Sequence, residues 1–492
     1  MVVLGRRINL ATLGPLALAA SRILIQACGL LVLIYAARTL RQDEMGMFAL
    51  MSSAVLLATK VSEAGWAELA TASSPGKLPD ANIFWCAVAA SGTMTLAYIL
   101  IGVVGGIFWE MPFHGWAIYF AMICTVMPTA MASTQYGVLI RDGRLSTLAG
   151  IQAVAEIAGT TVCIYSLMHG QGNLSLAYSR VTVAGFTVGG AFLAVRWIPS
   201  PTFSRADWGD NYRYSMVLVA ARVVSFVNSY GAEFLIGAFL GLREVGIYRV
   251  ASRIAGAVAE VCFEPLRVIG WNAIAAASNL DQRRRKISIA LELLLGFAFF
   301  VCMPIFVGLY FVASDLVDLV LERADWREAA PIIAVLALSK LCGIVSLFSE
   351  SSLSVIEKGK LIPRIALLSM CVTTAFTAMG GYFYATPVAI AWFQLGAGLF
   401  MTSFLGWLLY VNVGWSPVVV LKELRHPLAA VGVMSASMYA VTRLMQPGTT
   451  LMRLIAEVLI AAVTYLIASG REPWRQLSEI LAFRKRVAES PA

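Results

Sequence analysis

Charged residues are scarce in this sequence. Asp, Glu, Lys and Arg supply 13% of its 492 residues, whereas an average soluble protein has about 25%. So few charges cannot cover the surface of a water-soluble chain of this length. The shortage excludes a soluble enzyme, a coiled coil and a disordered chain.

Histidine and paired cysteine are lacking as well. The chain has 3 His and 8 Cys, and no two cysteines form a CxxC pair. All eight cysteines lie within apolar segments, where a thiol usually packs as a small buried side chain. We therefore expect no metal site and no disulfide framework.

Motifs for nucleotide hydrolysis and for the common hydrolases are absent too. The sequence contains no GxxxxGK[ST], no HExxH and no GxSxG, each of which would indicate a specific site chemistry. The net charge of +9 comes from short basic runs rather than one basic face, so nucleic acid is not an expected partner. We expect a protein that is not an enzyme, uses no cofactor, and is driven by an ion gradient, a substrate gradient or removal of its product.

Apolar residues, by contrast, make up 59% of the chain. They gather in runs of about 20 residues that lack the alternation of β-barrel strands, and runs of this length span a bilayer as helices. We predict an all-α polytopic membrane protein with about 14 transmembrane helices. The expected spans are residues 14–37, 47–70, 83–107, 116–139, 147–168, 176–196, 214–240, 247–273, 287–312, 330–354, 365–384, 387–411, 428–445 and 451–469.

The basic residues indicate how these spans are oriented. With the N-terminus inside, 22 of the 37 Lys and Arg lie in cytoplasmic segments and 5 lie in the opposite loops. This excess predicts that both termini are cytoplasmic and that Gly143 and Gly359 lie in cytoplasmic loops.

The two halves of the chain are similar to each other. Residues 40–48 match residues 240–248 at an offset of 200, and residues 140–145 match residues 356–361 at an offset of 216. This pattern predicts a parallel repeat of two six-helix bundles around a central cavity, an architecture typical of transporters. The expected domains are an N-terminal bundle (1–198), a cytoplasmic linker (199–213), a C-terminal bundle (214–411), two additional helices (412–469) and a basic amphipathic cytoplasmic tail (470–492).

Several short motifs resemble those of a known family. They are Ala37-Arg38-Thr39-Leu40 with Gly46-Met47-Phe48, residues 233–241 with Gly246-Ile247-Tyr248, residues 326–331, and Gly359-Lys360. They are similar to the Wzx-like polysaccharide exporters of the MOP flippase superfamily, over about residues 10–412. Glu233 stands where members often carry Asp.

The resemblance implies a function and a location. A Wzx-like protein is a flippase that moves polyprenyl-diphosphate-linked oligosaccharide across the bacterial cytoplasmic (inner) membrane, from the cytoplasmic to the outer leaflet. The implied partners are this lipid-linked substrate, membrane lipids, a polysaccharide polymerase and glycosyltransferases. In related peptidoglycan-precursor flippases an arginine that follows a serine in the first helix faces the cavity, and Ser21-Arg22 matches that pattern.

Charges inside the membrane are costly, at about 2.5–3.5 kcal/mol on insertion scales, so they should face a cavity or a partner. Five charged residues of the segment 247–273 project within a stripe about 60° wide, and the segment 214–240 carries a polar seam. The stripe consists of Arg249, Arg253, Glu260, Glu264 and Arg267, and the seam of Arg222, Ser225, Ser229 and Glu233. The candidate substrate-binding residues in the cavity are Arg22, Gln26, Arg222, Ser229, Glu233, Arg253 and Glu260.

Other intramembrane charges have simpler interpretations. Lys60–Glu63 and Glu264–Arg267 are spaced as internal ion pairs. Arg180 and the Arg453–Glu457 pair lie near the outer face, where long side chains reach the interface.

Other functions remain open at this stage. A cation-coupled multidrug exporter of the same superfamily often has an Asp in its first span, whereas all nine Asp residues here fall in expected loops. A membrane glycosyltransferase or polymerase would need a larger external loop than residues 313–329. A scaffold that recruits synthesis enzymes without transporting is the third alternative.

Overall fold

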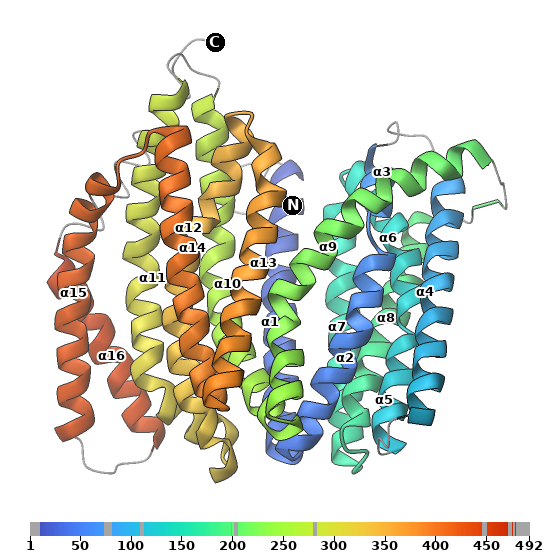
Figure 1. Ribbon diagram of the computed structural model, residues 1–492, viewed down its shortest axis with the longest axis horizontal. Coiled ribbons are helices and arrows are strands. Elements are labelled where there is room, and N and C mark those ends of the chain that lie inside the picture. Colours follow the sequence, from blue (N-terminus) through green and yellow to red (C-terminus); the bar gives the residue numbers. More distant parts are fainter. Residues whose placement is uncertain are drawn as a thin grey trace. The chain divides into compact units, whose positions relative to one another are not determined.

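The computed structural model describes residues 10–72, 81–108, 113–197, 199–200, 205–278, 283–444, 450–470, 475 and 478. The regular elements in these residues are all helices (Figure 1). They form two compact units, the first comprising Met1–Gly237 and Gly241–Gly246, the second Ala238–Leu240 and Ile247–Ala492.

In the described residues of the first unit there are eight helices and most of a ninth. They are α1 (Leu10–Thr39), α2 (Gln42–Ser62), α3 (Trp66–Ala72), α4 (Ala81–Phe108), α5 (Phe113–Ile123), α6 (Val126–Arg141), α7 (Leu145–Met168), α8 (Leu174–Val195) and α9 (Arg205–Phe239).

The described part of the second unit contains seven α-helices and two short 3₁₀ helices. They are α10 (Leu242–Ser278), α11 (Arg283–Leu321), η1 (Ala324–Glu328), α12 (Ala329–Val355), η2 (Gly359–Leu361), α13 (Ile362–Tyr384), α14 (Pro387–Val413), α15 (Pro417–Leu444) and α16 (Thr450–Ser469).

The expected all-α polytopic membrane fold is confirmed. Within the described residues every predicted span overlaps one helix or two consecutive helices, and 12 helical segments are long and apolar enough to cross a membrane. The helices α10 and α15 are not among the 12, because their charged residues lower the mean hydropathy. Both are nevertheless long enough to span, since an α-helix rises about 1.5 Å per residue.

Two of the expected spans are each broken into a pair of helices. Between α2 and α3, Gly65 adopts a φ of 91°, a conformation that glycine accepts without a Cβ clash. Between α5 and α6, the break precedes Pro128, whose ring and missing N–H do not fit the interior of a continuous helix. The apolar pattern runs through both breaks, so it does not reveal them.

Two expected loops are partly helical, which corrects the sequence-based boundaries. The expected linker 199–213 gives way to α9 at Arg205, and Trp208 and Tyr212 on this first stretch pack against the cluster around Trp66. The helix α9 up to Gly237 belongs to the first compact unit. The helix α11 continues to Leu321 rather than ending near residue 312, so the expected loop 313–329 begins inside a helix.

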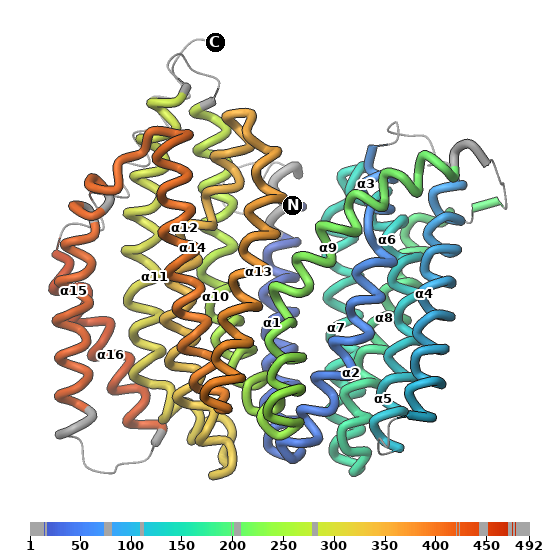
Figure 2. The backbone as a smooth tube through the Cα atoms, in the orientation of Figure 1, coloured from blue at the N-terminus to red at the C-terminus, as the bar shows by residue number. Residues whose placement is uncertain are grey.

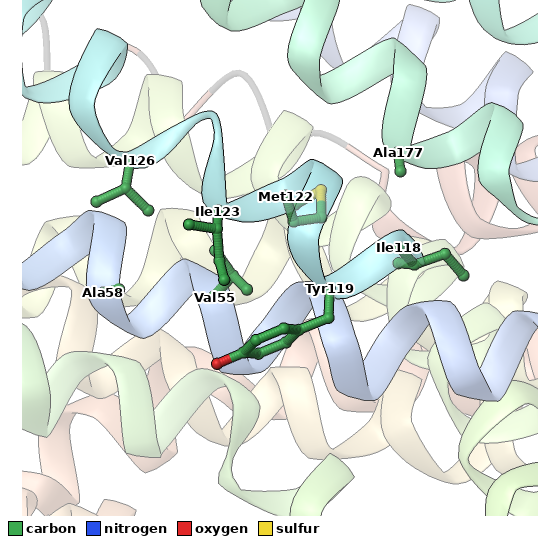
Figure 3. Packing of buried hydrophobic residues seen from close by; sticks show 8 residues of the cluster. All are labelled: Val55, Ala58, Ile118, Tyr119, Met122, Ile123, Val126 and Ala177. Atoms are coloured by element: carbon green, nitrogen blue, oxygen red, sulfur yellow. The ribbon is translucent and has the colours of Figure 1, made fainter. Parts of the chain in front are cut away.

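A hydrophobic cluster holds the first unit together. Figure 3 shows the Ile123 side chain of α5 directed toward Val55 of α2, with Ile118 of α5 in the same cluster. The Tyr119 hydroxyl of the same cluster donates to the Tyr98 carbonyl of α4 at 2.8 Å. Burying both the ring and its hydroxyl in this way fixes α5 against α2 and α4.

The glycine pair of the sequence repeat forms a backbone crossing in the first unit. A methyl group on Gly46 would collide with the Leu242 carbonyl oxygen, and one on Gly246 would collide with the Gln42 carbonyl oxygen. Each methyl would also lie 3.0 Å from the backbone nitrogen of the other glycine. The two repeat mates therefore meet in a symmetric contact between α2 and the first turn of α10 that only glycine permits.

The last two helices of the second unit are bound to α11. Figure 2 shows α15 and α16 as an antiparallel pair, and the Tyr465 hydroxyl of α16 donates to the Phe300 carbonyl of α11 at 2.8 Å. Glu292 of α11 accepts the backbone N–H of Ser416 at 3.0 Å, just before α15 begins. Hydrogen bonds just before the start of α15 and near the end of α16 thus fix this pair of helices to α11.

Candidate functional site

In the first unit, α9 bonds to the break between α2 and α3. The Ser215 hydroxyl donates to the Ala64 carbonyl at 2.6 Å, an acceptor that the interrupted helix leaves without its usual partner. Two turns further along α9, the Arg222 Nη2 lies 3.0 Å from Glu68 Oε1 of α3. Lys60 and Glu63 pair at 3.2 Å at the end of α2, as their spacing predicts. Four charged side chains therefore gather around this break.

A second contact between α9 and α2 is buried. The Ser53 hydroxyl donates to Glu233 Oε2 at 2.8 Å, and the two residues are 0% and 3% exposed. A carboxylate at this depth is stabilised by such charge-assisted hydrogen bonds. The sequence indicated Glu233 but not Ser53. One feature of the sequence could have indicated Ser53. It lies 200 residues before the candidate residue Arg253, and 200 is the offset of the repeat.

The structure divides the predicted polar seam of α9 into two environments. Arg222, Ser225 and Ser229 are exposed, whereas Glu233 is buried. On α1, Arg22 is exposed and Gln26 is half-buried. The exposed members of this set lie on apolar membrane helices, where a polar surface indicates access to water or substrate rather than to lipid.

In the second unit, the charged stripe lies on α10. Glu264 and Arg267 form the expected pair at 3.0 Å. Glu260 is exposed and Arg253 is half-buried. Pro265 lies between the two acidic positions and Arg267, and it removes one backbone hydrogen bond from the middle of α10.

Two sets of charges differ from their expected roles. Arg180 pairs with Glu156 of α7 at 3.3 Å rather than only extending to the interface. Arg453 Nε lies 3.1 Å from Asp315 Oδ2 and 3.3 Å from Glu457 Oε1. The expectation that all Asp residues lie in loops is wrong: Asp43 lies in α2, Asp207 and Asp210 in α9, and Asp315 and Asp318 in α11. Of these, Asp315 is 9% exposed.

The sequence also missed Glu68 as the partner of Arg222. Glu68 lies in an apolar stretch five residues after Glu63, a spacing that places it on a different helix face if the span is continuous. The break at Gly65 changes the direction of the chain. Helical periodicity assumes a continuous helix, so it could not predict that Glu68 faces Arg222.

The arrangement suits the binding of an anion with several oxygens. Arginine presents a planar set of donors that binds two oxygens at once, and Arg22 and Arg222 are exposed. Among the described residues no group of three or more His, Cys, Asp or Glu could hold a metal ion.

Comparison with known proteins gives relatives in polysaccharide synthesis. Residues 35–331 match the family described as polysaccharide biosynthesis protein. The chain is 25% identical over 259 residues to the succinoglycan biosynthesis transport protein ExoT of Rhizobium meliloti. That match covers 52% of this chain and 51% of the relative, so the chain aligns with about half the length of this curated protein.

Solved structures share the fold at low sequence identity. The lipid II flippase MurJ, in an inward closed conformation, has a TM-score of 0.73 and 14% identity, and the similarity covers 94% of this chain and 99% of MurJ. An inward-facing multidrug resistance MATE family transporter of the MOP superfamily has a TM-score of 0.56 and 12% identity, covering 78% of this chain and 93% of that one. The chain therefore shares the fold of these two proteins. Because the family match spans more than half of the sequence, the chain belongs to the family of polysaccharide biosynthesis proteins.

Proposed function

We propose that this protein is a flippase for polyprenyl-diphosphate-linked oligosaccharide. It would carry the sugar head from the cytoplasmic to the outer leaflet of a bacterial inner membrane by alternating access of its two halves, with both termini cytoplasmic. No bond is made or broken in this reaction. A polysaccharide polymerase and glycosyltransferases would act after and before it.

One observation supports this proposal more than any other. Exposed arginines lie on membrane helices of a chain that belongs to a polysaccharide biosynthesis family and has the MOP fold. A diphosphate is the part of such a substrate that an arginine binds best, because the guanidinium donors match paired oxygens. The names of the relatives, a succinoglycan transport protein and a lipid II flippase, are consistent with this class of cargo.

The three candidate arginines provide the first testable prediction. Arg22, Arg222 and Arg253 would hold the diphosphate head, so changing all three to Ala should abolish export of the surface polysaccharide in a deletion strain. Export is measured per amount of protein in the membrane, together with the lipid-linked intermediate that accumulates inside. The Arg253→Lys variant should keep normal abundance and lose part of the export, because an ammonium cannot bind two oxygens in the same way.

Arg222 needs its own control because it also pairs with Glu68 at 3.0 Å. Arg222→Ala alone leaves Glu68 without this partner, whereas the double variant Arg222→Ala/Glu68→Gln removes both charges. If Arg222 binds substrate, the double variant restores abundance but not export. Normal export by an abundant triple arginine variant contradicts the proposal. The alternative of a scaffold that recruits synthesis enzymes without transporting would then remain.

A cation-coupled multidrug exporter is favoured by one observation. Glu233 is a buried carboxyl on a membrane helix, 3% exposed, and intramembrane acids commonly bind coupling ions. This alternative predicts that the deletion strain becomes sensitive to cationic drugs and keeps its surface polysaccharide. The flippase proposal predicts the opposite pair of results.

A further inference from the structure

Two buried carboxyl groups meet in the second unit, away from the residues assigned to substrate. Asp315 of α11 is 9% exposed and Glu457 of α16 is 0% exposed. A single arginine nitrogen, Arg453 Nε, lies 3.1 Å from Asp315 Oδ2 and 3.3 Å from Glu457 Oε1. One donor therefore brings the two acids together.

The second oxygen of Glu457 completes the geometry. Glu457 Oε2 is fully buried and no donor of the described residues reaches it, and Asp315 lies beside Glu457 because both acids contact the same Arg453 nitrogen. Two ionised carboxylates cannot bond, because both only accept. A proton on either of them supplies the missing donor.

Charge balance leads to the same conclusion. With both acids ionised, the cluster has two negative charges and the single positive charge of Arg453, all on apolar helices. A net charge in this environment is costly, and two carboxylates at one site do not both ionise readily. One bound proton makes the cluster neutral.

We propose that Asp315 and Glu457 form a proton-binding site that holds one proton between them and fastens α16 to α11. The proton completes an O–H···O bond between the two helices. Its loss leaves two negative charges in contact and weakens the packing of α16. The proposal concerns the last helix of the chain and is independent of which substrate is carried.

The surroundings favour a proton over a metal cation. Arg453 already contacts both acids, and a second cation beside it would be repelled. The helix α15, which also packs on α16, carries Lys422, Glu423, Arg425 and His426 near its start and Arg443 near its end. Its Ser437 hydroxyl pairs with the Thr464 hydroxyl of α16 at 3.1 Å. On α16 itself, Tyr465 donates to the Phe300 carbonyl and lies two turns further along the helix.

Infrared spectroscopy of the purified full-length protein tests the site directly. A protonated carboxyl group has a carbonyl band that is distinct from that of a carboxylate and shifts in D₂O. At neutral pH the wild-type spectrum minus that of Glu457→Gln should contain this band, and so should wild type minus Asp315→Asn. The variant Asp318→Asn is the matched control, because Asp318 lies one turn further on α11 and pairs with Arg327 at 2.8 Å; its spectrum should keep the band.

The second readout is thermal unfolding as a function of pH. A proton that is bound in the folded state is lost as pH rises, so the wild-type melting temperature should fall from mildly acidic to mildly alkaline pH. Glu457→Gln should flatten this dependence, because its amide donates permanently to Asp315. The proposal is overturned if neither difference spectrum contains the band, if Asp318→Asn also loses it, or if sodium at constant ionic strength raises the wild-type melting temperature and Glu457→Gln abolishes that rise. The two difference spectra use independent variants, Glu457→Gln and Asp315→Asn. If one variant does not fold, the spectrum of the other still tests the site.

Discussion

At the scale of single residues, the intramembrane charges differ in the kind of partner that each one has. Glu264–Arg267 and Lys60–Glu63 are ion pairs between residues three positions apart, and exposed pairs of this kind contribute about 0–1 kcal/mol each. Glu233 is different, because it is buried and accepts from Ser53 at 2.8 Å. A hydrogen bond to a buried charged group contributes more, about 1.5–3 kcal/mol.

The Ser53–Glu233 bond therefore gives a stability prediction. Ser53→Ala removes a donor from a buried carboxyl group and should lower the free energy of unfolding by about 1.5–3 kcal/mol. Thermal unfolding of the purified protein in detergent measures the change. Ser225→Ala, at an exposed position on α9, is the matched control and should change it by less than about 0.5 kcal/mol. Equal stability of the two variants would contradict the assigned bond.

At the scale of elements, the crossing of α2 and α10 depends on two glycines. Gly46 and Gly246 are repeat mates, and each lacks room for a methyl group because a backbone carbonyl of the opposing segment occupies the space. Backbone atoms cannot turn aside as a side chain does. The contact thus explains why glycine occurs at the same place in both halves.

Substituting either glycine tests this crossing. Gly46→Ala and Gly246→Ala should each cost about 1–3 kcal/mol, the usual range for overpacking, despite the better helix propensity of Ala. The control is Gly150→Ala in α7, where no atom lies within 4 Å of the added methyl group; it should stabilise the protein by up to about 1 kcal/mol. Melting temperatures of the three variants would show the difference in sign, and the same sign for all three would refute the close approach.

The helix breaks belong to this scale as well. The residues Glu63-Ala64-Gly65 interrupt an apolar run that satisfies the length of a span. The Ser215 hydroxyl accommodates the break by donating to the Ala64 carbonyl at 2.6 Å. This partner comes from a helix about 150 residues later in the chain, which is why local sequence could not indicate it.

At the scale of the whole molecule, the distribution of basic residues predicts topology. Of the 37 Lys and Arg, 22 lie in segments assigned to the cytoplasm and 5 in the opposite loops. Cysteines introduced at Asp142 and Lys358, in a chain whose exposed Cys124 and Cys371 are replaced by Ser, should react with a membrane-impermeant maleimide only after the cells are permeabilised. A cysteine at Gln171, between α7 and α8, should react in intact cells. Labelling of residue 142 or 358 from outside would contradict the orientation.

The energy source gives a second prediction at this scale. The sequence contains no GxxxxGK[ST] motif, and without it we expect no phosphate-binding loop of that type. The purified protein should therefore hydrolyse ATP no faster than a mock preparation from the deletion strain. ATPase activity that copurifies with the chain and disappears when the chain is mutated would end the gradient-driven or substrate-driven proposal.

The sequence by itself determined the class of fold, the helix positions and several ion pairs. Apolar length, charge scarcity and residue spacing are local properties, and a helix in a membrane satisfies its backbone hydrogen bonds within one segment. The Lys60–Glu63 and Glu264–Arg267 pairs follow from the same local geometry.

Only the tertiary structure decided which polar groups are buried and which partners they have. Ser53 meets Glu233 across 180 residues, and Arg222 meets Glu68 across 154. Asp315 lies in a helix rather than a loop, and it shares Arg453 with Glu457 of the last helix. Helical periodicity specifies a face of one helix but not the helix that faces it. Buried charges select their partners through packing between distant segments, and that packing is absent from any single stretch of sequence.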